Sequence, residues 1–163
     1  MLSNGSRSPT SSSGNGSDKG LYSFLEQTVS DHMTRDVMTV RRNLSMRELG
    51  RLFETTDYNG YPVEEDSQVI GFVTKFDYLA CFEFTPARML PHYDDLMKRT
   101  VGDVMTADFI YVRSDTKLTR VLQLMVEHRI RSMPVIDSRL RIVGIIARED
   151  VVHALEQCAK DEA

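Results

Sequence analysis

The feature that most constrains the fold of this chain is an internal repeat. The stretch VSDHMTRD at 29–36 returns as VGDVMTAD at 101–108. The correspondence then continues through Pro62-Val63 and Pro134-Val135, through Gly71 and Gly144, and through Asp77 and Asp150. Chance similarity would not keep so many different residue types in register, so the sequence predicts two copies of one folding unit.

Each copy predicts a strand, a helix, two strands and a closing helix. Asn43 and Ser45 both offer a start signal for the first long helix, and the sequence leaves the choice between them open. A copy of about 55 residues is marginal alone, so we expect the two copies to share a core. The expected elements are 37–40, 45–55, 61–63, 69–73 and 75–84 in the first copy, and 109–112, 117–128, 133–137, 142–147 and 148–157 in the second.

The remaining stretches set the expected domain limits. The first 20 residues are rich in Ser and Gly and cannot bury enough apolar surface to offset the entropy lost on ordering. We therefore expect a disordered tail over 1–20, the first copy with a leading helix over 21–84, a connecting segment over 85–100, the second copy over 101–158, and a tail over 159–163. The stretch 80–100 is too apolar for a free linker, so we expect it to pack across the junction or against a second chain; its apolar side chains are Phe82, Phe84, Met89, Leu90, Tyr93 and Leu96.

Composition excludes several function classes. Hydrophobic residues make up 41% and charged residues 27%, as in soluble globular proteins. The net charge of −4 argues against nucleic acid or a membrane surface as partner, and no apolar run approaches the roughly 20 residues that span a bilayer. We expect a cytoplasmic protein. The two cysteines and four histidines show no metal-ligand or catalytic spacing, so we expect no metal, no catalytic residue and no required cofactor.

The apolar stretch 69–73 leads directly into Thr74 and Asp77, and two interpretations of this junction are open. Thr and Asp three residues apart commonly cap a helix. The same two side chains can also face one spot and hold a ligand. For the junction taken alone, capping is the commoner arrangement.

The repeated motifs resemble a known family. Asp31-x-Met33-Thr34 before a strand, Tyr61-Pro62-Val63, and Gly71-x-x-Thr74-x-x-Asp77, each with a counterpart in the second copy, are similar to a tandem pair of cystathionine-β-synthase (CBS) domains over residues 28–157. The resemblance implies an α/β (α+β) fold of two β-α-β-β-α repeats packed as one disc with a pseudo-twofold axis. It also implies two clefts that bind AMP, ADP, ATP or S-adenosylmethionine, and a homodimer of such discs.

The resemblance also implies roles for particular residues. Thr74 and Asp77 match the ribose-binding pair, and an ionised carboxylate suits a vicinal diol because it accepts from two hydroxyls. Phosphate contacts fall to Arg131 and Ser132 from the opposite half, with Lys75. The residues expected to contact the base are Val37, Tyr58, Tyr61, Phe109, Ile110 and Ile130.

The second cleft is expected to be weaker. It keeps Asp150 with Arg148 beside it, but Ala147 stands where Thr74 does. Asn59 also stands where Arg131 does, so a charged phosphate contact is lost. Loss of a neutral hydroxyl contact costs about 0.5–1.5 kcal/mol and loss of a charge-assisted contact about 1.5–3 kcal/mol. Together these predict binding weaker by roughly 30-fold or more.

Glu64 departs from the family pattern, because an apolar residue, Ile136, stands at its place in the second copy. Either that strand face is exposed or the register slips locally. Acidic side chains near the cleft would oppose a polyphosphate, which favours a monophosphate or S-adenosylmethionine over ATP.

The leading hypothesis is a non-catalytic regulatory module that binds an adenosine ligand and signals through a dimer or a protein partner. The alternative is a structural dimerisation module with degenerate, ligand-free clefts. An enzyme is the main rival from a different function class, and the sequence offers it no nucleophile with an adjacent base.

Overall fold

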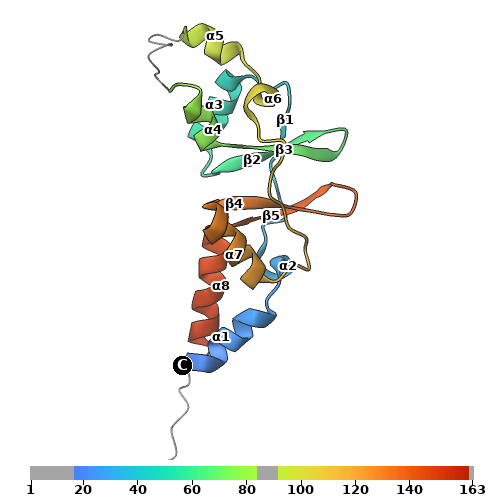
Figure 1. The fold of residues 1–163 in the computed structure, drawn as a ribbon, viewed down its shortest axis with the longest axis vertical. Helices are drawn as coiled ribbons and strands as arrows, with labels where there is room; N and C mark the ends of the chain where they lie inside the picture. Colours follow the sequence, from blue (N-terminus) through green and yellow to red (C-terminus); the bar gives the residue numbers. More distant parts are fainter. Residues whose placement is uncertain (1–16, 84–91, 162–163) are drawn as a thin grey trace, which may run out of the picture.

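The structure, a computed structural model, describes residues 17–83 and 92–161. Figure 1 shows a three-stranded sheet and a two-stranded sheet that meet at the middle of the molecule, with helices above and below. We call the two parts the β1–β3 half and the β4–β5 half. The elements are α1 (Ser17–Glu26), α2 (Val29–His32), β1 (Val40–Arg41), α3 (Met46–Thr55), β2 (Gly60–Glu65), β3 (Gln68–Thr74), α4 (Lys75–Ala80), α5 (Tyr93–Lys98), α6 (Val101–Val104), α7 (Leu118–His128), β4 (Ser132–Ile136), β5 (Ile142–Ala147) and α8 (Arg148–Lys160).

The α+β class and the expected order of long elements are confirmed. Ser45, not Asn43, caps α3, because the Ser45 hydroxyl accepts from the Glu48 N–H and the Glu48 carboxylate accepts from the Ser45 N–H. The first strand of each copy is shorter than expected. In the first copy it is only Val40–Arg41, and in the second a single bridge joins Val112 to Val135.

Two helices extend past limits that were expected from the sequence. Helix α1 begins at Ser17, so the tail expected over 1–20 does not extend through Ser17–Gly20, and residues 1–16 lie outside the described part. Helix α8 continues to Lys160 beyond the limit at 158, and residues 162–163 again lie outside. In the connecting segment, α5 packs against α3 and buries Met97, while residues 84–91 lie outside the description.

The opening segment of each copy packs on the other copy. Helices α1 and α2 precede β1 in the chain, yet they contact α7 and α8. Thr34 pairs with Ile145 of β5, and Thr106 pairs in the same way with Phe72 of β3. In both pairs the two residues exchange backbone hydrogen bonds of 2.9–3.0 Å. The two copies therefore exchange their first segments, and this reciprocity gives the molecule its pseudo-twofold symmetry.

Among residues 17–83 and 92–161, the buried apolar side chains form two clusters, each with residues of both copies, where we expected one shared core. Val29 and Met33 of the first copy lie in the cluster of the β4–β5 half, with Leu118, Val121 and Ile146. The cluster of the β1–β3 half contains, reciprocally, Val101 of the second copy packed with Met46, Leu49, Val63 and Val73. Neither half can form its core without a segment of the other copy.

Gly71 and Gly144 make this exchange possible. A Cβ atom on Gly71 would lie 2.6 Å from Met105 Sδ, and one on Gly144 would lie 2.6 Å from Met33 Sδ. Real Cβ atoms do not approach sulfur so closely, so the missing side chain admits the methionine of the exchanged segment. The Met and the Gly of the repeated motifs are thus contact partners across the two copies.

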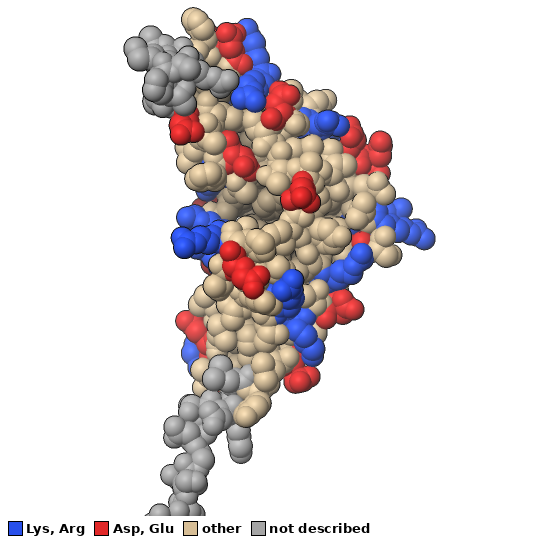
Figure 2. Space-filling view, in the orientation of Figure 1, with Lys and Arg blue, Asp and Glu red and all other residues tan. Residues whose placement is uncertain are grey.

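The β2–β3 and β4–β5 hairpins also touch. The Val69 N–H donates to the carbonyl of Leu140 over 2.8 Å, and Gln68 Nε2 donates to the carbonyl of Arg139 over 3.2 Å. Figure 2 shows acidic side chains at the tip of the β2–β3 hairpin and basic ones at the tip of its neighbour, on the right of the view. This pairing of opposite charge favours contact between the halves.

Both explanations offered for Glu64 hold in part. The ladder shifts register between Val63 and Glu64, but it shifts equally between Val135 and Ile136, so the shift belongs to the fold and not to the acid. Glu64 is half-buried and lies opposite Arg41 of β1, whereas Ile136 is fully buried. A cationic neighbour and partial exposure make the carboxylate tolerable here.

Candidate functional site

Thr74 and Asp77 form a complete capping box at the start of α4. The Thr74 N–H and the Thr74 hydroxyl both donate to Asp77 Oδ2, over 2.8 and 2.9 Å, and the Asp77 N–H donates to Thr74 Oγ1 over 3.1 Å. The capping interpretation is therefore correct as local geometry. Asp77 Oδ1 takes part in no hydrogen bond or ion pair among the described residues. Capping fixes the carboxylate through one oxygen and leaves the other available as an acceptor.

The equivalent junction of the second copy is poorer in hydrogen bonds. The Ala147 N–H donates to Asp150 Oδ2 over 2.7 Å, and Ala147 has no hydroxyl to give or accept the other two bonds. Burial raises the pKa of Asp150, while the bond from Ala147 and the nearby His32 and His153 oppose this rise and Glu149 adds to it. The ionised form of Asp150 is thus stabilised by fewer hydrogen bonds than a complete capping box would supply.

In each half, the pairing of the two hairpin strands places the residues just before the Pro-Val pair beside the strand–helix junction of that same half. Gly60 lies opposite Thr74, and the Lys75 N–H donates to the carbonyl of Asn59. Ser132 lies opposite Ala147, and the Arg148 N–H donates to the carbonyl of Arg131. The structure therefore brings Asn59 to the Asp77 junction, and Arg131 and Ser132 to the Asp150 junction.

The phosphate residues expected at the Asp77 junction have no described bond to it. Arg131 is exposed and Ser132 half-buried, and neither makes a side-chain hydrogen bond or an ion pair with Thr74 or Asp77 in the described part of the chain. Lys75 directs its ammonium toward the ring of Phe53, with Nζ 5.9 Å from the ring centroid. Their role in phosphate binding stays a prediction.

Among the residues expected to contact the base, Tyr61 lies in the core. It is 1% exposed, its ring centroid lies 5.2 Å from that of Phe53, and its hydroxyl hydrogen-bonds to Thr56. A side chain packed in this way has no face to offer a ligand in this structure. The other five expected residues are half-buried: Val37, Tyr58, Phe109, Ile110 and Ile130.

The exchange of opening segments between the copies decides which strand–helix junction is approached by each residue that was expected to contact the base. Phe109 and Ile110 follow Thr106, which pairs with Phe72 of β3, the strand that leads into Thr74. Val37 follows Thr34, which pairs with Ile145 of β5, the strand that leads into Ala147. Sequence reasoning missed this crossing, although the repeated Met and Gly of the two motifs were its signal.

In the described part of the chain, no helix is long and apolar enough to cross a bilayer, and no three His, Cys, Asp or Glu side chains cluster as metal ligands would. The family model "CBS domain" matches residues 29–83 and 101–157. The matches contain both strand–helix junctions, both Pro-Val strands and both exchanged Met-Thr segments.

Individual proteins resemble the chain over most of its length. It is 30% identical to the chloroplastic CBS domain-containing protein CBSX1 of Arabidopsis thaliana, over 93% of this chain and 75% of that protein. The crystal structure of CBSX2 in complex with AMP matches with a TM-score of 0.69 and 31% identity, over 80% of this chain and 96% of that chain. The CBS domain pair of MJ0100, in complex with 5-methylthioadenosine and S-adenosyl-L-methionine, matches with a TM-score of 0.67 over 80% of this chain and 97% of that chain; at 23% identity it shows the fold alone.

Several other relatives are longer proteins. The chain spans 46% of MJ1225 from Methanocaldococcus jannaschii and 26% of a homoserine O-acetyltransferase from Methanohalobium evestigatum. CBS domains thus occur both in proteins of about this size and as parts of enzymes. The cytoplasmic location expected from the sequence stays a prediction, and CBSX1 is named as a chloroplastic protein.

Proposed function

Because the chain belongs to the CBS domain family and carries two CBS domains in tandem, we propose that it is a regulatory module that binds an adenosine-containing ligand. The proposed ligands are AMP, ADP, ATP and S-adenosylmethionine. The observation that carries the proposal is the Asp77 carboxylate, which is fixed by Thr74 through Oδ2 while Oδ1 has no described partner. The AMP complex of the similar protein CBSX2 supports the ligand class.

The chemistry of Asp77 suits a ribose. A ribose offers two neighbouring hydroxyl donors, and an ionised carboxylate only accepts. Hydrogen bonds to a charged acceptor contribute about 1.5–3 kcal/mol. Since the capping box already fixes the rotamer of Asp77, little further side-chain entropy is lost when a ligand binds.

We propose that Phe109 and Ile110 flank the base at this junction, because the Phe72–Thr106 pair brings their segment to β3. For the phosphate we propose Arg131 and Ser132, which lie at the start of β4, beside the Asp150 junction of the other half. A ligand with these contacts would bridge the two halves.

A bridging ligand gives the module a way to signal. The β1–β3 half contains α6 of the second copy, so a change at the Asp77 junction acts on both copies through Phe72 and Thr106. Phe76, directly before Asp77, is 80% exposed and offers an apolar contact next to the site. We propose that the output is a rearrangement of a homodimer or of a bound protein partner.

A structural dimerisation module with ligand-free clefts is the second candidate. The Asp150 junction favours it, because only one of the three hydrogen bonds of the Asp77 junction is present there. Under the leading proposal this second cleft binds more weakly or stays empty. We propose no catalytic role, and the acetyltransferase relative extends well beyond the part that matches.

Calorimetry and thermal denaturation with AMP, ADP, ATP and S-adenosylmethionine test the proposal. A ligand at 100 times its Kd should stabilise the protein by about 2.7 kcal/mol, which is roughly 5–10 °C in Tm for a chain of this size. Asp77→Ala should abolish this stabilisation.

Asp103→Ala is the matched control. Asp103 accepts from the N–H and the hydroxyl of Thr100 as Asp77 does from Thr74, at an exposed position on α6. It should lower stability as Asp77→Ala does but leave ligand binding intact. Binding that survives Asp77→Ala would refute the site, and no stabilisation by any of the four ligands would favour the structural module.

A further inference from the structure

The two halves present related helix faces on one side of the molecule. Figure 1 shows α4 and α8 on the left of the view and both hairpins on the right. Helix α3 contacts α4, and α7 likewise contacts α8. Each pair exposes apolar side chains: Phe76 is 80% and Leu79 62% exposed on α4, while Val126 of α7 is 69% and Val152 of α8 54% exposed. Apolar side chains exposed together on neighbouring helices mark an interaction surface.

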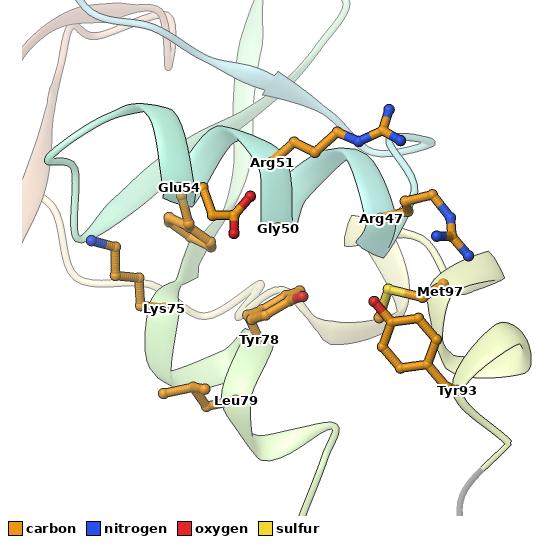
Figure 3. Close-up of a pocket in the computed structure, with 10 residues that line it drawn as sticks. Arg47, Gly50, Arg51, Glu54, Lys75, Tyr78, Leu79, Tyr93 and Met97 are labelled. Carbon is orange, nitrogen blue, oxygen red and sulfur yellow. The ribbon is translucent and has the colours of Figure 1, made fainter.

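The face of the β1–β3 half is concave. A cavity of about 470 Å³ lies between α3, α4 and α5 (Figure 3), and its lining includes Leu79 and Tyr78. At Gly50, α3 sends no side chain into this space. A Cβ atom there would lie 2.6 Å from the Tyr78 hydroxyl oxygen, so the tyrosine ring occupies the place of a side chain at this position. We call this cavity the hollow.

The equivalent face of the β4–β5 half is convex. Leu122 stands at the position of Gly50, and Val126 at that of Glu54. These two apolar residues are four apart, so they lie one above the other on α7. Val152 lies on the adjacent helix α8 and completes what we call the ridge, which consists of Leu122, Val126 and Val152. The same place in the fold is therefore hollow in one half and filled by apolar side chains in the other.

The two faces also differ in charge. Three basic residues and one acid line the hollow, namely Arg47, Arg51, Lys75 and Glu54. Arg47 pairs with Asp94 over 3.5 Å, which leaves Arg51 and Lys75 against Glu54. The face around the hollow is thus basic.

Beside the ridge the balance is reversed. Glu149 and Glu156 lie around Val152 with one arginine, Arg148, and all three charged side chains are exposed. Pairing either face with the same face of a second copy would bring like charges together. Pairing the two unlike faces sets a basic surface against an acidic one, which favours that register.

We propose that two copies of the chain pair antiparallel, so that the ridge of each copy enters the hollow of the other. This inference rests on the homodimer of the proposed function and adds which faces meet. A twofold axis relates the two contacts between ridge and hollow, so the pair closes on itself and forms no fibre. Parallel pairing would leave two hollows facing each other and bring Arg51 and Lys75 close to the same residues of the second copy.

The antiparallel pair places its interface beside the proposed ligand junction. Phe76 directly precedes Asp77 and lies one turn before Leu79 on α4, next to the hollow. A ligand held by Asp77 in one copy would thus act on the surface that receives the ridge of the other.

Thiol cross-linking decides the orientation. In a Cys81→Ala background, which leaves only the buried Cys158, Leu79→Cys labels the hollow and Val126→Cys labels the ridge. Both positions are exposed, so neither substitution disturbs the core. A short bis-maleimide should join the two single-variant proteins after they are mixed and exchange subunits, and it should join neither protein to itself. Self-cross-linking of either protein, or no cross-link in the mixture, would overturn antiparallel pairing.

Sedimentation equilibrium measures the strength of the pair. The parent should be a dimer, and Val126→Glu should raise its dissociation constant at least about tenfold, because a charge replaces an apolar side chain in the interface. The fold accepts the acid, since Glu54 stands at this position in the first copy. Tyr111→Glu is the matched control at another exposed apolar position. Tyr111 borders Leu124, which lies about 200° around α7 from Leu122, so this variant should dimerise as the parent does.

Neither measurement uses a ligand, so both are independent of the adenosine site. A monomeric parent, or equal dissociation constants for Val126→Glu and Tyr111→Glu, would refute the pairing even where AMP binds at Asp77. Antiparallel dimers that bind no AMP would support the pairing and count against the proposed function alone.

Discussion

The difference between the two strand–helix junctions makes Ala147→Thr the most informative substitution. A threonine there restores the two bonds that the first junction has and the second lacks, a hydroxyl that donates to the carboxylate and one that accepts from the backbone N–H. Replacing alanine by a good N-cap residue stabilises a helix by about 1 kcal/mol, within a range of 0.5–2. The expected gain in Tm is therefore about 2–4 °C.

The gain should depend on pH in a defined direction. Burial holds the folded-state pKa of Asp150 above its ordinary value, so ionisation of this group costs stability as pH rises through the interval between 3.8 and that raised value. A donated hydroxyl bond favours the ionised form and moves the pKa down. Ala147→Thr should thus stabilise most at neutral pH, and its benefit should shrink as pH falls through this interval.

Urea denaturation of the parent and of Ala147→Thr at pH 7 and pH 4 measures this effect. Thr74→Ala at the first junction is the reciprocal variant and should lose about what Ala147→Thr gains. Ala147→Ser guards against a clash of the threonine methyl group, since Ala147 is half-buried. If both Thr and Ser at 147 leave stability unchanged at pH 7 while Thr74→Ala lowers it, the comparison of the two junctions is wrong.

Under the proposed function, Ala147→Thr should also strengthen binding at the second cleft, and calorimetry would show a stoichiometry closer to two.

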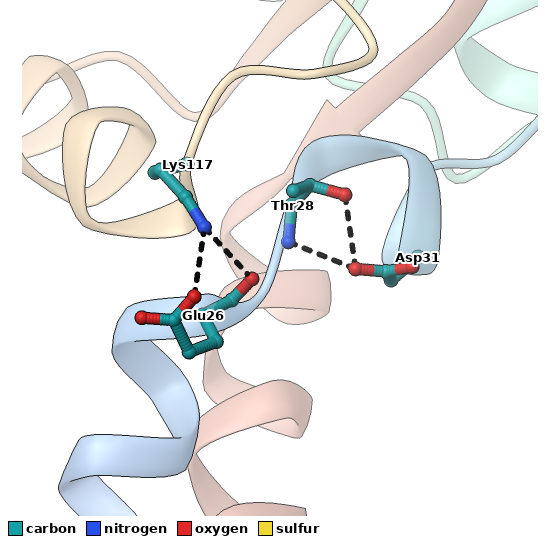
Figure 4. Close-up of polar contacts among 4 residues, drawn as sticks. All are labelled: Glu26, Thr28, Asp31 and Lys117. Carbon is teal, nitrogen blue, oxygen red and sulfur yellow. Dashed lines mark hydrogen bonds and ion pairs between the residues drawn. The ribbon is translucent and has the colours of Figure 1, made fainter.

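Two further predictions concern the exchange of segments between copies. Gly71→Ala should destabilise the protein by about 1–3 kcal/mol, because its Cβ would overlap Met105 Sδ. Adding Met105→Ala should recover part of this loss, as measured by urea denaturation. If the free-energy changes of the two substitutions simply add in the double variant, the contact between Gly71 and Met105 is contradicted. Asp31 accepts from the N–H and hydroxyl of Thr28, where α1 joins the short helix α2 beside the Lys117–Glu26 ion pair (Figure 4). These bonds lower the pKa of Asp31, so its stabilisation is present above pH 3.8 and lost as pH falls through the lower folded-state value. Asp31→Asn should reduce the acid dependence of stability, and an unchanged pH profile would count against this role.

The sequence by itself determined the repeat, the class and order of the elements, and the two junctions at which a ligand is proposed. Those features depend on local periodicity and on motifs of a few residues, which can be seen without a partner in space. It also ranked the junctions, because the absence of a hydroxyl at Ala147 is a property of one residue. The structure adds the hydrogen bonds that this absence removes.

Only the tertiary structure decided which copy each opening segment packs against. Residues 35–39, between Thr34 and β1, can span roughly 17 Å when extended, so the chain length permits packing on either copy. The choice depends on the fit of Met33 over Gly144 and of Met105 over Gly71, which are contacts between residues far apart in the chain. The same holds for Tyr61, whose aromatic character suggested a ligand contact until burial and the bond to Thr56 placed it in the core. For Asp77, the sequence left capping and ligand binding as rivals, whereas the geometry makes them compatible, because the cap engages Oδ2 and leaves Oδ1 available.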